Sequence, residues 1–195
     1  MSIVIRDLKR GDQDQVRKIV LEGLAERWGQ EFDPSYNKDL DDIYGYYVDR
    51  HHATVAVIEE HQQLQYQQQE SVAINDEQQT HSPMIIGCGV LLPLPAEDVY
   101  GTWCAEPESI RKKANSAGLT KLCRMMRLSV SADRRGQGLA KKMIRHLIEK
   151  ARERQFDLIL VETEVLWTSA VQIYKSEGFS VAEADEENIH YTYRL

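Results

Sequence analysis

The amino-acid sequence predicts a mixed α/β fold, in which helices cover a central sheet of mostly antiparallel strands. The first observation is a strand at 122–130 that leads through a glycine-containing turn into a helix at 136–155 and then a strand at 156–165. A strand–helix–strand unit of this length implies a parallel pair with a right-handed crossover. The second observation is the succession of short strands around this unit, which is typical of an antiparallel meander.

The first half of the chain supplies two helices and three strands in this interpretation. Residues 3–6 are mostly β-branched, which favours a strand. A helix is expected at 12–28, where apolar residues recur at helical spacing, and a second helix at 38–49. Strands are expected at 53–59 and 84–92, and because they flank a polar loop we expect them to pair in antiparallel fashion.

The amphipathic helix at 136–155 is the clearest element of the second half. Its apolar side chains form two neighbouring rows: Leu139, Met143, Leu147 and Ala151 in one, and Ala140, Ile144 and Ile148 in the other. The strand that follows has an apolar centre, as expected of a strand buried on both faces. A short helix at 169–177 ends at Gly178, and strands at 179–182 and 189–195 complete the sheet.

Length and composition fit a single domain with two insertions. The 195 residues correspond to a domain of ordinary size, so we expect one domain over residues 1–195. The segment 61–83 contains eight glutamines and no usable apolar period, which predicts an extended or partly disordered insertion. A second, irregular insertion is expected at 93–120, which carries three prolines.

Charge and hydropathy exclude several classes of protein. The formal net charge is −7, which argues against nucleic acid as a partner because non-specific binding needs a basic footprint. We expect no contact with membranes, since no apolar run is long enough to span one and the N-terminus lacks the pattern of a secretory signal. Three widely spaced cysteines favour a cytoplasmic protein. The histidines have no cysteine or acid at ligand spacing, so no metal is expected.

The turn that begins the long helix carries the most chemical information. Its two glycines, Gly136 and Gly138, let the backbone pass close to a ligand. The first amide N–H groups of a helix lack internal partners and lie at the positive end of its dipole, a geometry that binds phosphate. Basic residues outnumber acids between Arg134 and Arg154, which favours a polyphosphate ligand. A tight turn with basic residues for solubility is the alternative, and the spacing matches neither a P-loop nor a dinucleotide-binding motif.

Two motifs in this half of the chain resemble those of the GNAT superfamily of N-acetyltransferases. The run Arg135-Gly136-Gln137-Gly138-Leu139-Ala140 resembles the Arg/Gln-x-x-Gly-x-Gly/Ala signature of that family. The segment 170–179, with Tyr174 at its centre, resembles the family's Ala-x-x-x-Tyr-x-x-x-Gly-Phe segment. The two motifs occur in the family's order, and the resemblance is strong over 121–180 and diffuse over 1–60.

The resemblance implies that acetyl-CoA is the donor. The amides of residues 135–140 would hold its diphosphate. The backbone of Leu128, Ser129 and Val130 would pair with the pantetheine arm as if the arm were an added strand. For this to happen, the strands at 122–130 and 156–165 would splay apart and expose unpaired backbone groups.

The resemblance also implies catalytic roles. Tyr174 matches the tyrosine that protonates the leaving thiolate, although a tyrosine on a short amphipathic helix can also simply pack in the core. Many members carry a glutamate that acts as the general base at the position where this chain has Arg124. Glu162 and Glu164, which share one face of a strand, are the substitute candidates for the base, with a solvated strand end as the alternative. Trp167 stands where many members have an asparagine. Its indole either covers the pantetheine arm or packs against the protein.

The acceptor side is expected near residues 22–49. This segment carries eight acids against two basic residues, interleaved with aromatic side chains. In the fold that the resemblance implies, the first two helices line the acceptor's entrance, and a negative, aromatic-lined cleft favours a cationic amine. A solvated acidic face with its aromatic residues in the core is the alternative.

These implications describe an N-acetyltransferase that moves an acetyl group from acetyl-CoA to a primary amine of a small molecule or peptide. The amine would attack directly within a ternary complex, since no cysteine lies in the motifs to carry the acyl group. A non-catalytic acyl-CoA-binding module of the same fold is the alternative, which Arg124 leaves open. A homodimer is also left open.

Overall fold

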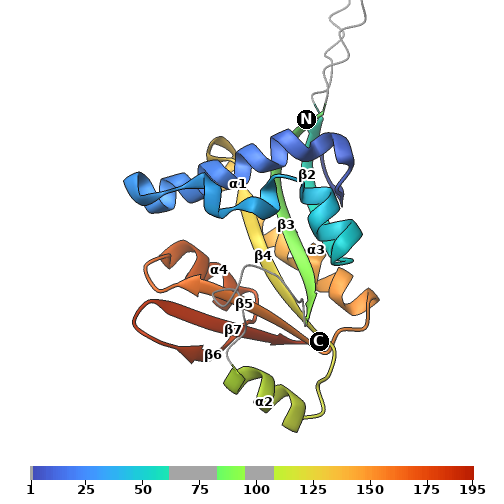
Figure 1. The fold of residues 1–195 in the computed structure, drawn as a ribbon, viewed down its shortest axis with the longest axis vertical. Helices are drawn as coiled ribbons and strands as arrows, with labels where there is room; N and C mark the ends of the chain where they lie inside the picture. Colours follow the sequence, from blue (N-terminus) through green and yellow to red (C-terminus); the bar gives the residue numbers. More distant parts are fainter. Residues whose placement is uncertain (1, 62–82, 95–107) are drawn as a thin grey trace, which may run out of the picture.

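The computed structural model of the chain describes residues 2–61, 83–94 and 108–195. These residues form one seven-stranded sheet with helices on both faces (Figure 1). The strands are β1 (Ser2–Asp7), β2 (Thr54–His61), β3 (Met84–Leu94), β4 (Leu122–Val130), β5 (Leu158–Glu164), β6 (Ser180–Ala184) and β7 (Asn188–Arg194). The helices are α1 (Gln13–Trp28), α2 (Glu108–Ser116), α3 (Leu139–Glu153) and α4 (Thr168–Ser176).

The strand order confirms the predicted mixed fold. Across the sheet the strands follow the order β1-β2-β3-β4-β5-β7-β6. Neighbouring strands pair in antiparallel fashion except β4 and β5, which are parallel. The chain passes from β4 to β5 through α3, as the strand–helix–strand unit requires.

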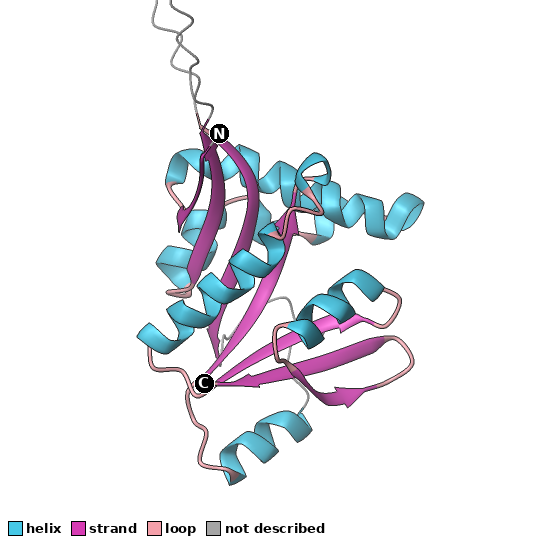
Figure 2. Ribbon diagram, turned by 180° about the vertical axis from the view of Figure 1, so that it is seen from behind, coloured by secondary structure: helices cyan, strands magenta, loops and turns pink. Residues whose placement is uncertain are grey.

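The parallel pair is short, and the two strands then diverge. Pairing runs from Leu122 opposite Leu158 to Arg124 opposite Leu160. Beyond that point β4 continues beside β3 and β5 continues beside β7. Figures 1 and 2 show the resulting V, with the arm of β1–β4 on one side and the arm of β5–β7 on the other. The predicted splay, meaning the opening between β4 and β5 beyond Arg124 and Leu160, is therefore present.

Helices bury apolar side chains on both faces of the sheet. On the face seen in Figure 2, the predicted rows of α3, apart from the half-buried Ala140, pack against β2, β3 and β4 and join Tyr174 of α4 in one core. On the opposite face α1 covers β3 and β4 through side chains such as Val16 and Val20. The helix α2 packs Ile110 and Ala114 against β5 and the start of β4. The buried face of each helix follows from its apolar spacing.

Two expectations for irregular or helical segments need correction. The predicted helix at 38–49 is instead a short 3₁₀ turn at Lys38–Leu40 followed by a π-helix at Tyr44–Arg50. The side chain of Gln13 bonds the carbonyl of Leu40 at 2.8 Å and the amide of Ile43 at 2.9 Å, so it takes backbone groups that a continuous helix would use.

The second predicted insertion is also more regular than expected. Within 93–120, the described part contains the end of β3 and the whole of α2. Most of the glutamine-rich insertion at 61–83 lies outside the described residues. Within the described ranges, no helix combines the length and the apolar composition needed to cross a bilayer.

Candidate active site

The glycine turn leaves β4 at Val130 and enters α3 at Leu139. Gly136 and Gly138 have φ angles of 77° and 73°, in the left-handed region that disfavours other residues. A Cβ at either position would meet nothing within 4 Å, so the backbone conformation, rather than lack of space, requires glycine. Gln137 is exposed with both glycines, whereas Leu139 is anchored in the core.

The first turn of α3 is open to a ligand. Gly138 is the N-cap of the helix and, being a glycine, offers no side chain to the amides that follow. The next residue, Leu139, holds the turn against the sheet, and Ala140 is half-buried beside it. Amide N–H groups at a helix N-terminus with exposed glycines before them form an anion-binding arrangement.

The two arginines before the turn have different partners. Arg134 donates to Glu60 through Nε at 3.1 Å and Nη2 at 2.8 Å, which directs it toward β2. Arg135 instead donates from Nε to the carbonyl of Val130 at 3.1 Å and from Nη1 to Glu26 of α1 at 2.6 Å. Arg135 therefore lies at the edge of β4 that faces the splay.

The last residues of β4 turn alternate backbone groups toward the splay. The amide of Ser131 bonds the carbonyl of Ile86 in β3 at 2.9 Å. Because successive residues of a strand face opposite neighbours, Leu128 and Val130 direct their backbone groups away from β3 and Ser129 directs its groups toward it. Two of the three predicted pantetheine-contacting residues thus offer backbone to the splay.

Tyr174 is buried on α4, with an exposed fraction of 6%. Its ring centre lies 5.5 Å from that of Phe179 and 5.9 Å from that of Tyr191. Burial raises the pKa of Tyr174 well above its ordinary value, and the nearby charge of Arg27 only partly opposes this shift. The residue packs in the core, and its phenol can still donate a proton.

Glu164 is held by the last turn of α1. Nη2 of Arg27 lies 2.8 Å from Oε1 of Glu164, and the guanidinium carbon lies 3.4 Å from the centre of the Trp167 ring. Burial lowers the pKa of Arg27, although the charge of Glu164 opposes the shift. Trp167 therefore stacks on a protein cation at the mouth of the splay.

Glu162 has looser contacts deeper in the splay. Nη2 of Arg124 lies 3.5 Å from its Oε2, and Nδ1 of His190 lies 3.9 Å from the same oxygen. Arg124 is buried, and its Nε has no hydrogen-bond partner among the described residues. His190 stands opposite Glu162 in the register of β5 and β7.

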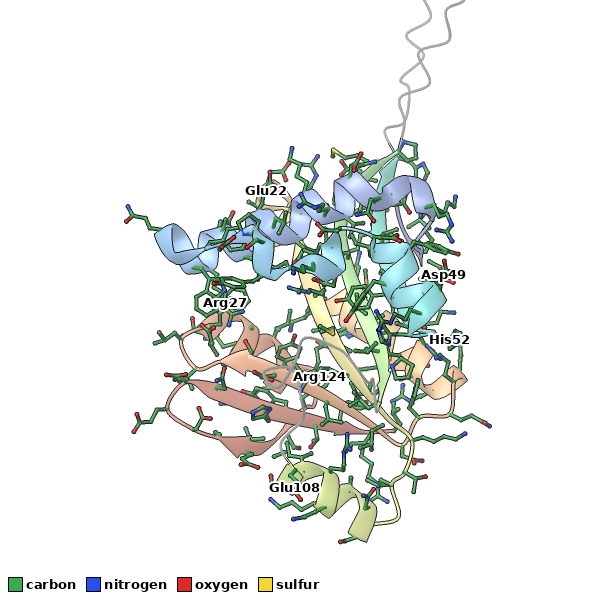
Figure 3. All side chains as sticks on the ribbon, viewed as in Figure 1. Glu22, Arg27, Asp49, His52, Glu108 and Arg124 are labelled. Atoms are coloured by element: carbon green, nitrogen blue, oxygen red, sulfur yellow. The ribbon has the colours of Figure 1, made fainter. Side chains whose placement is uncertain are left out.

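These side chains gather on one face of the splay. Glu162 and Glu164 share the face of Leu160, which is opposite the face that packs on α3. Figure 3 shows Arg124 near the point where the strands part and Arg27 between α1 and the arm of β5 and α4. No sequence motif marks Arg27 or His190, because only the tertiary structure brings them to the candidate bases.

The acidic segment expected on the acceptor side is neutralised in part. Four of its acids pair with arginines: Glu26 with Arg135, Asp39 with Arg127, Asp41 with Arg17 and Asp49 with Arg10. Of its aromatic residues, Tyr47 is buried, Trp28 and Tyr36 are exposed, and Phe32, Tyr44 and Tyr46 are half-buried. Among the described residues, no group of three or more His, Cys, Asp or Glu is placed to hold a metal ion.

Comparisons with known proteins agree with this geometry. The chain is 32% identical over 97 residues to N-acetyltransferase 8B of Rattus norvegicus, a match that covers 48% of this chain and 40% of that protein. The matches to the curated relatives span about a quarter to two fifths of the relatives' length.

Solved structures match over almost the whole chain. A GNAT-family acetyltransferase from Staphylococcus aureus has a TM-score of 0.66 at 16% identity, covering 100% of this chain and 99% of that one. A putative acetyltransferase from Salmonella typhimurium with acetyl-CoA has a TM-score of 0.60 at 14% identity, covering 100% and 95%. The NatC complex bound to Gag peptide and CoA contains a chain with a TM-score of 0.59 at 19% identity, covering 100% and 99%. These likenesses establish the fold.

The family itself follows from the sequence match. The model of the acetyltransferase (GNAT) family matches residues 28–179, which include both motifs, β4, β5 and the turn between them. This chain belongs to the acetyltransferase (GNAT) family.

Proposed function

We propose that this chain transfers an acetyl group from acetyl-CoA to a primary amine of a small molecule or peptide. The observation that carries the proposal is the divergence of β4 and β5 beyond Arg124, with the glycine turn at its edge. The similar chains from Salmonella and from NatC were solved with acetyl-CoA and with CoA and a peptide, which supports this donor and an amine on a peptide as one acceptor.

The donor lies along β4 in this proposal. Its diphosphate binds the amides of residues 135–140, and its pantetheine arm pairs with the backbone of Leu128 and Val130. The carbonyl of Val130 now accepts from Arg135, so that contact opens when the pantetheine amide takes its place. The guanidinium of Arg135, whose side chain is 49% exposed, keeps its pair with Glu26 and can offer its remaining N–H groups to the diphosphate.

The transfer is a direct attack of the amine on the thioester. A C–N bond forms at the carbonyl carbon, and the C–S bond breaks as the tetrahedral intermediate collapses. Tyr174 gives its proton to the leaving thiolate, and its raised pKa keeps that proton in place until then. Glu162 takes the proton of the amine, because Glu164 is already engaged with Arg27 at 2.8 Å.

The described cysteines do not favour an acyl-enzyme intermediate. Burial raises the pKa of Cys88 to about 12 and raises the pKa of Cys123 well above its ordinary value. Only a thiolate is an effective nucleophile, so neither side chain is activated for acyl transfer. A ternary complex is therefore the favoured route.

A second candidate function is acyl-CoA binding without turnover. Arg124 occupies the position where related enzymes carry a base, and its guanidinium faces Glu162 at 3.5 Å. If this pairing prevents Glu162 from accepting a proton, the chain would retain the donor cradle and lack a base.

Release of free thiol separates the two candidates. The chain is incubated with acetyl-CoA and a panel of cationic and neutral amines, and thiol is followed over time. The proposal predicts amine-dependent release and stabilisation by CoA, about 2.7 kcal/mol at a hundredfold excess over its dissociation constant. Stabilisation without turnover on any amine favours the binding module. If CoA does not stabilise the chain and no thiol is released, both candidates are overturned.

A matched pair of variants tests the cradle itself. Gly138→Ala forces a side chain into a left-handed conformation and should weaken CoA binding, whereas Gly11→Ala, at a glycine with ordinary φ and open space, should not.

We further propose that residues 1–195 act as one domain. The cationic acceptor, the cytoplasmic location and the homodimer stay predictions from the sequence.

A further inference from the structure

The strand β4 carries a bulge next to the splay. Its register with β3 shifts by one residue, so that Arg127 and Leu128 together stand opposite Gly89. Arg127 has a φ angle of 53°, in the left-handed region. A residue with a side chain adopts this conformation at a cost and keeps it only where its surroundings hold it.

The side chain of Arg127 is fixed by a buried polar network. Its Nε and Nη2 each donate to a carboxylate oxygen of Asp39 at 3.0 Å, and its Nη1 donates to Oδ1 of Asn37 at 3.0 Å. The hydroxyl of Tyr47 donates to the same carboxylate at 2.6 Å. The side chain of Asp39 is fully buried, so each of its hydrogen bonds forms in a low-dielectric environment.

The backbone of the bulge is fastened as well. The thiol of Cys88 donates to the carbonyl of Arg127 at 3.4 Å. On the opposite face, a Cβ at Gly89 of β3 would lie 2.9 Å from a methyl of Leu147, so α3 packs directly against β3 beside the bulge. The segment around Asp39 thus holds the bulge on one face of the sheet, and α3 covers the neighbouring strand on the other.

The bulge determines what β4 presents to the splay. An inserted residue reverses which later residues face each side of a strand. With the bulge, Leu128 and Val130 direct their backbone groups away from β3, as the bond from Ser131 to Ile86 shows. Without it, Ser129 would face the splay in their place. The network around Arg127 therefore fixes the register of the edge that is proposed to bind the donor.

We propose that Arg127 is a positioning residue for acetyl transfer, whose buried ion pair with Asp39 holds the bulge that turns the backbone of Leu128 and Val130 toward acetyl-CoA. This inference rests on the proposed function. Asp39 lies in the segment expected on the acceptor side, so the same ion pair also ties that segment to the donor edge.

The test compares Arg127→Gly with Arg127→Ala. Both variants lose the guanidinium, but only glycine adopts a φ of 53° without strain. The dissociation constant of acetyl-CoA, kcat and KM are measured well below each variant's melting temperature. We expect Arg127→Ala to lose at least about tenfold in kcat, in line with the cost of misplacing reacting groups, and Arg127→Gly to lose less. Equal losses would mean that the guanidinium acts by a route other than the conformation of the bulge, and would overturn the proposal.

Arg6→Ala is the matched control. Arg6, on β1 and away from the splay, forms a partly buried pair with Asp12 at 2.7 Å. Its loss should lower the melting temperature and leave the donor affinity and kcat unchanged. If the Arg127 variants behave in the same way, losing stability alone, Arg127 is structural and the proposal is wrong.

A milder variant keeps the test decisive if both Arg127 variants unfold. Tyr47→Phe removes one donor from Asp39 and keeps the buried ring. The proposal expects a lower kcat with a folded protein, and an unchanged kcat contradicts it. Wild-type protein that neither binds acetyl-CoA nor releases thiol would instead overturn the proposed function, and this inference with it.

Discussion

Nη2 of Arg27 lies 2.8 Å from Oε1 of Glu164, and this ion pair joins the last turn of α1 to the end of β5 across the splay. The preceding residue, Glu26, pairs with Arg135 of the glycine turn at 2.6 Å. Two successive residues of α1 therefore contact the two sides of the proposed donor site. The end of α1 is placed to hold both sides at a fixed separation.

Loss of Arg27 should destabilise the protein measurably. Arg27→Ala removes a charged hydrogen bond and the stack on Trp167, and we expect the free energy of unfolding to fall by about 1–3 kcal/mol. Arg17→Ala on the same helix removes an exposed pair and should change it by less than about 0.5 kcal/mol. Urea titrations measure both, and equal effects would show that Arg27 contributes no more than a surface charge.

The two candidate bases should differ in activity. Glu162→Gln removes the carboxylate proposed to take the proton, and we expect kcat to fall by about 10²–10⁴-fold. Glu164→Gln keeps a hydrogen-bonding partner for Arg27 and should cost less than about tenfold. Steady-state thiol release on one amine measures both variants. The opposite ranking would assign the base to Glu164.

Tyr174 and its neighbour Tyr191 form a matched pair. Tyr174→Phe removes the proposed acid, so kcat should fall while the dissociation constant of CoA stays near that of the wild type. Tyr191 contacts the same ring, and its buried hydroxyl has no hydrogen-bond partner among the described residues. Tyr191→Phe should therefore keep kcat and keep or raise the melting temperature. A normal kcat in Tyr174→Phe would leave Tyr174 with a packing role only.

Acid should weaken the link between β1 and the start of α1. Burial works to raise the pKa of Asp12, but hydrogen bonds from Arg6 and from the amide of Lys9 outweigh it and lower the pKa below its ordinary value of 3.8. A carboxyl with a depressed folded-state pKa stabilises the fold above its unfolded pKa and loses that contribution as the pH falls through the folded value.

At pH 7 the free energy of unfolding should therefore be larger for wild type than for Asp12→Asn. Below about pH 4 the two values should converge. Urea titrations across this pH range measure the difference. A gap between the two proteins that is constant with pH would show that the charge of Asp12 contributes nothing and that only its shape matters.

Local signals in the sequence predicted much of the fold and the glycine turn. The crossover unit and the turn are marked by residues close together in the chain, so spacing places them, whereas the role of Tyr174 was implied by a resemblance and stays a proposal. The interruption between Leu40 and Ile43 was not predicted, because the side chain responsible, Gln13, lies far earlier in the sequence.

The remainder of the site depends on register and on distant pairs. Arg127 and Asp39 are 88 residues apart, and no periodicity links them. His190 reaches Glu162 only because β7 pairs with β5 in one particular register. The bulge of β4 is likewise invisible in a strand whose sequence runs on without a glycine or proline.

Hydrogen exchange with and without acetyl-CoA tests the donor site most directly. If the donor lies along β4 with its diphosphate on the turn, the amides of Leu128, Val130 and residues 136–140 should exchange more slowly in its presence. The amide of Ser131, already bonded to Ile86, should change little. Saturating binding that protects none of these amides, or protects a different surface, would contradict the proposed site.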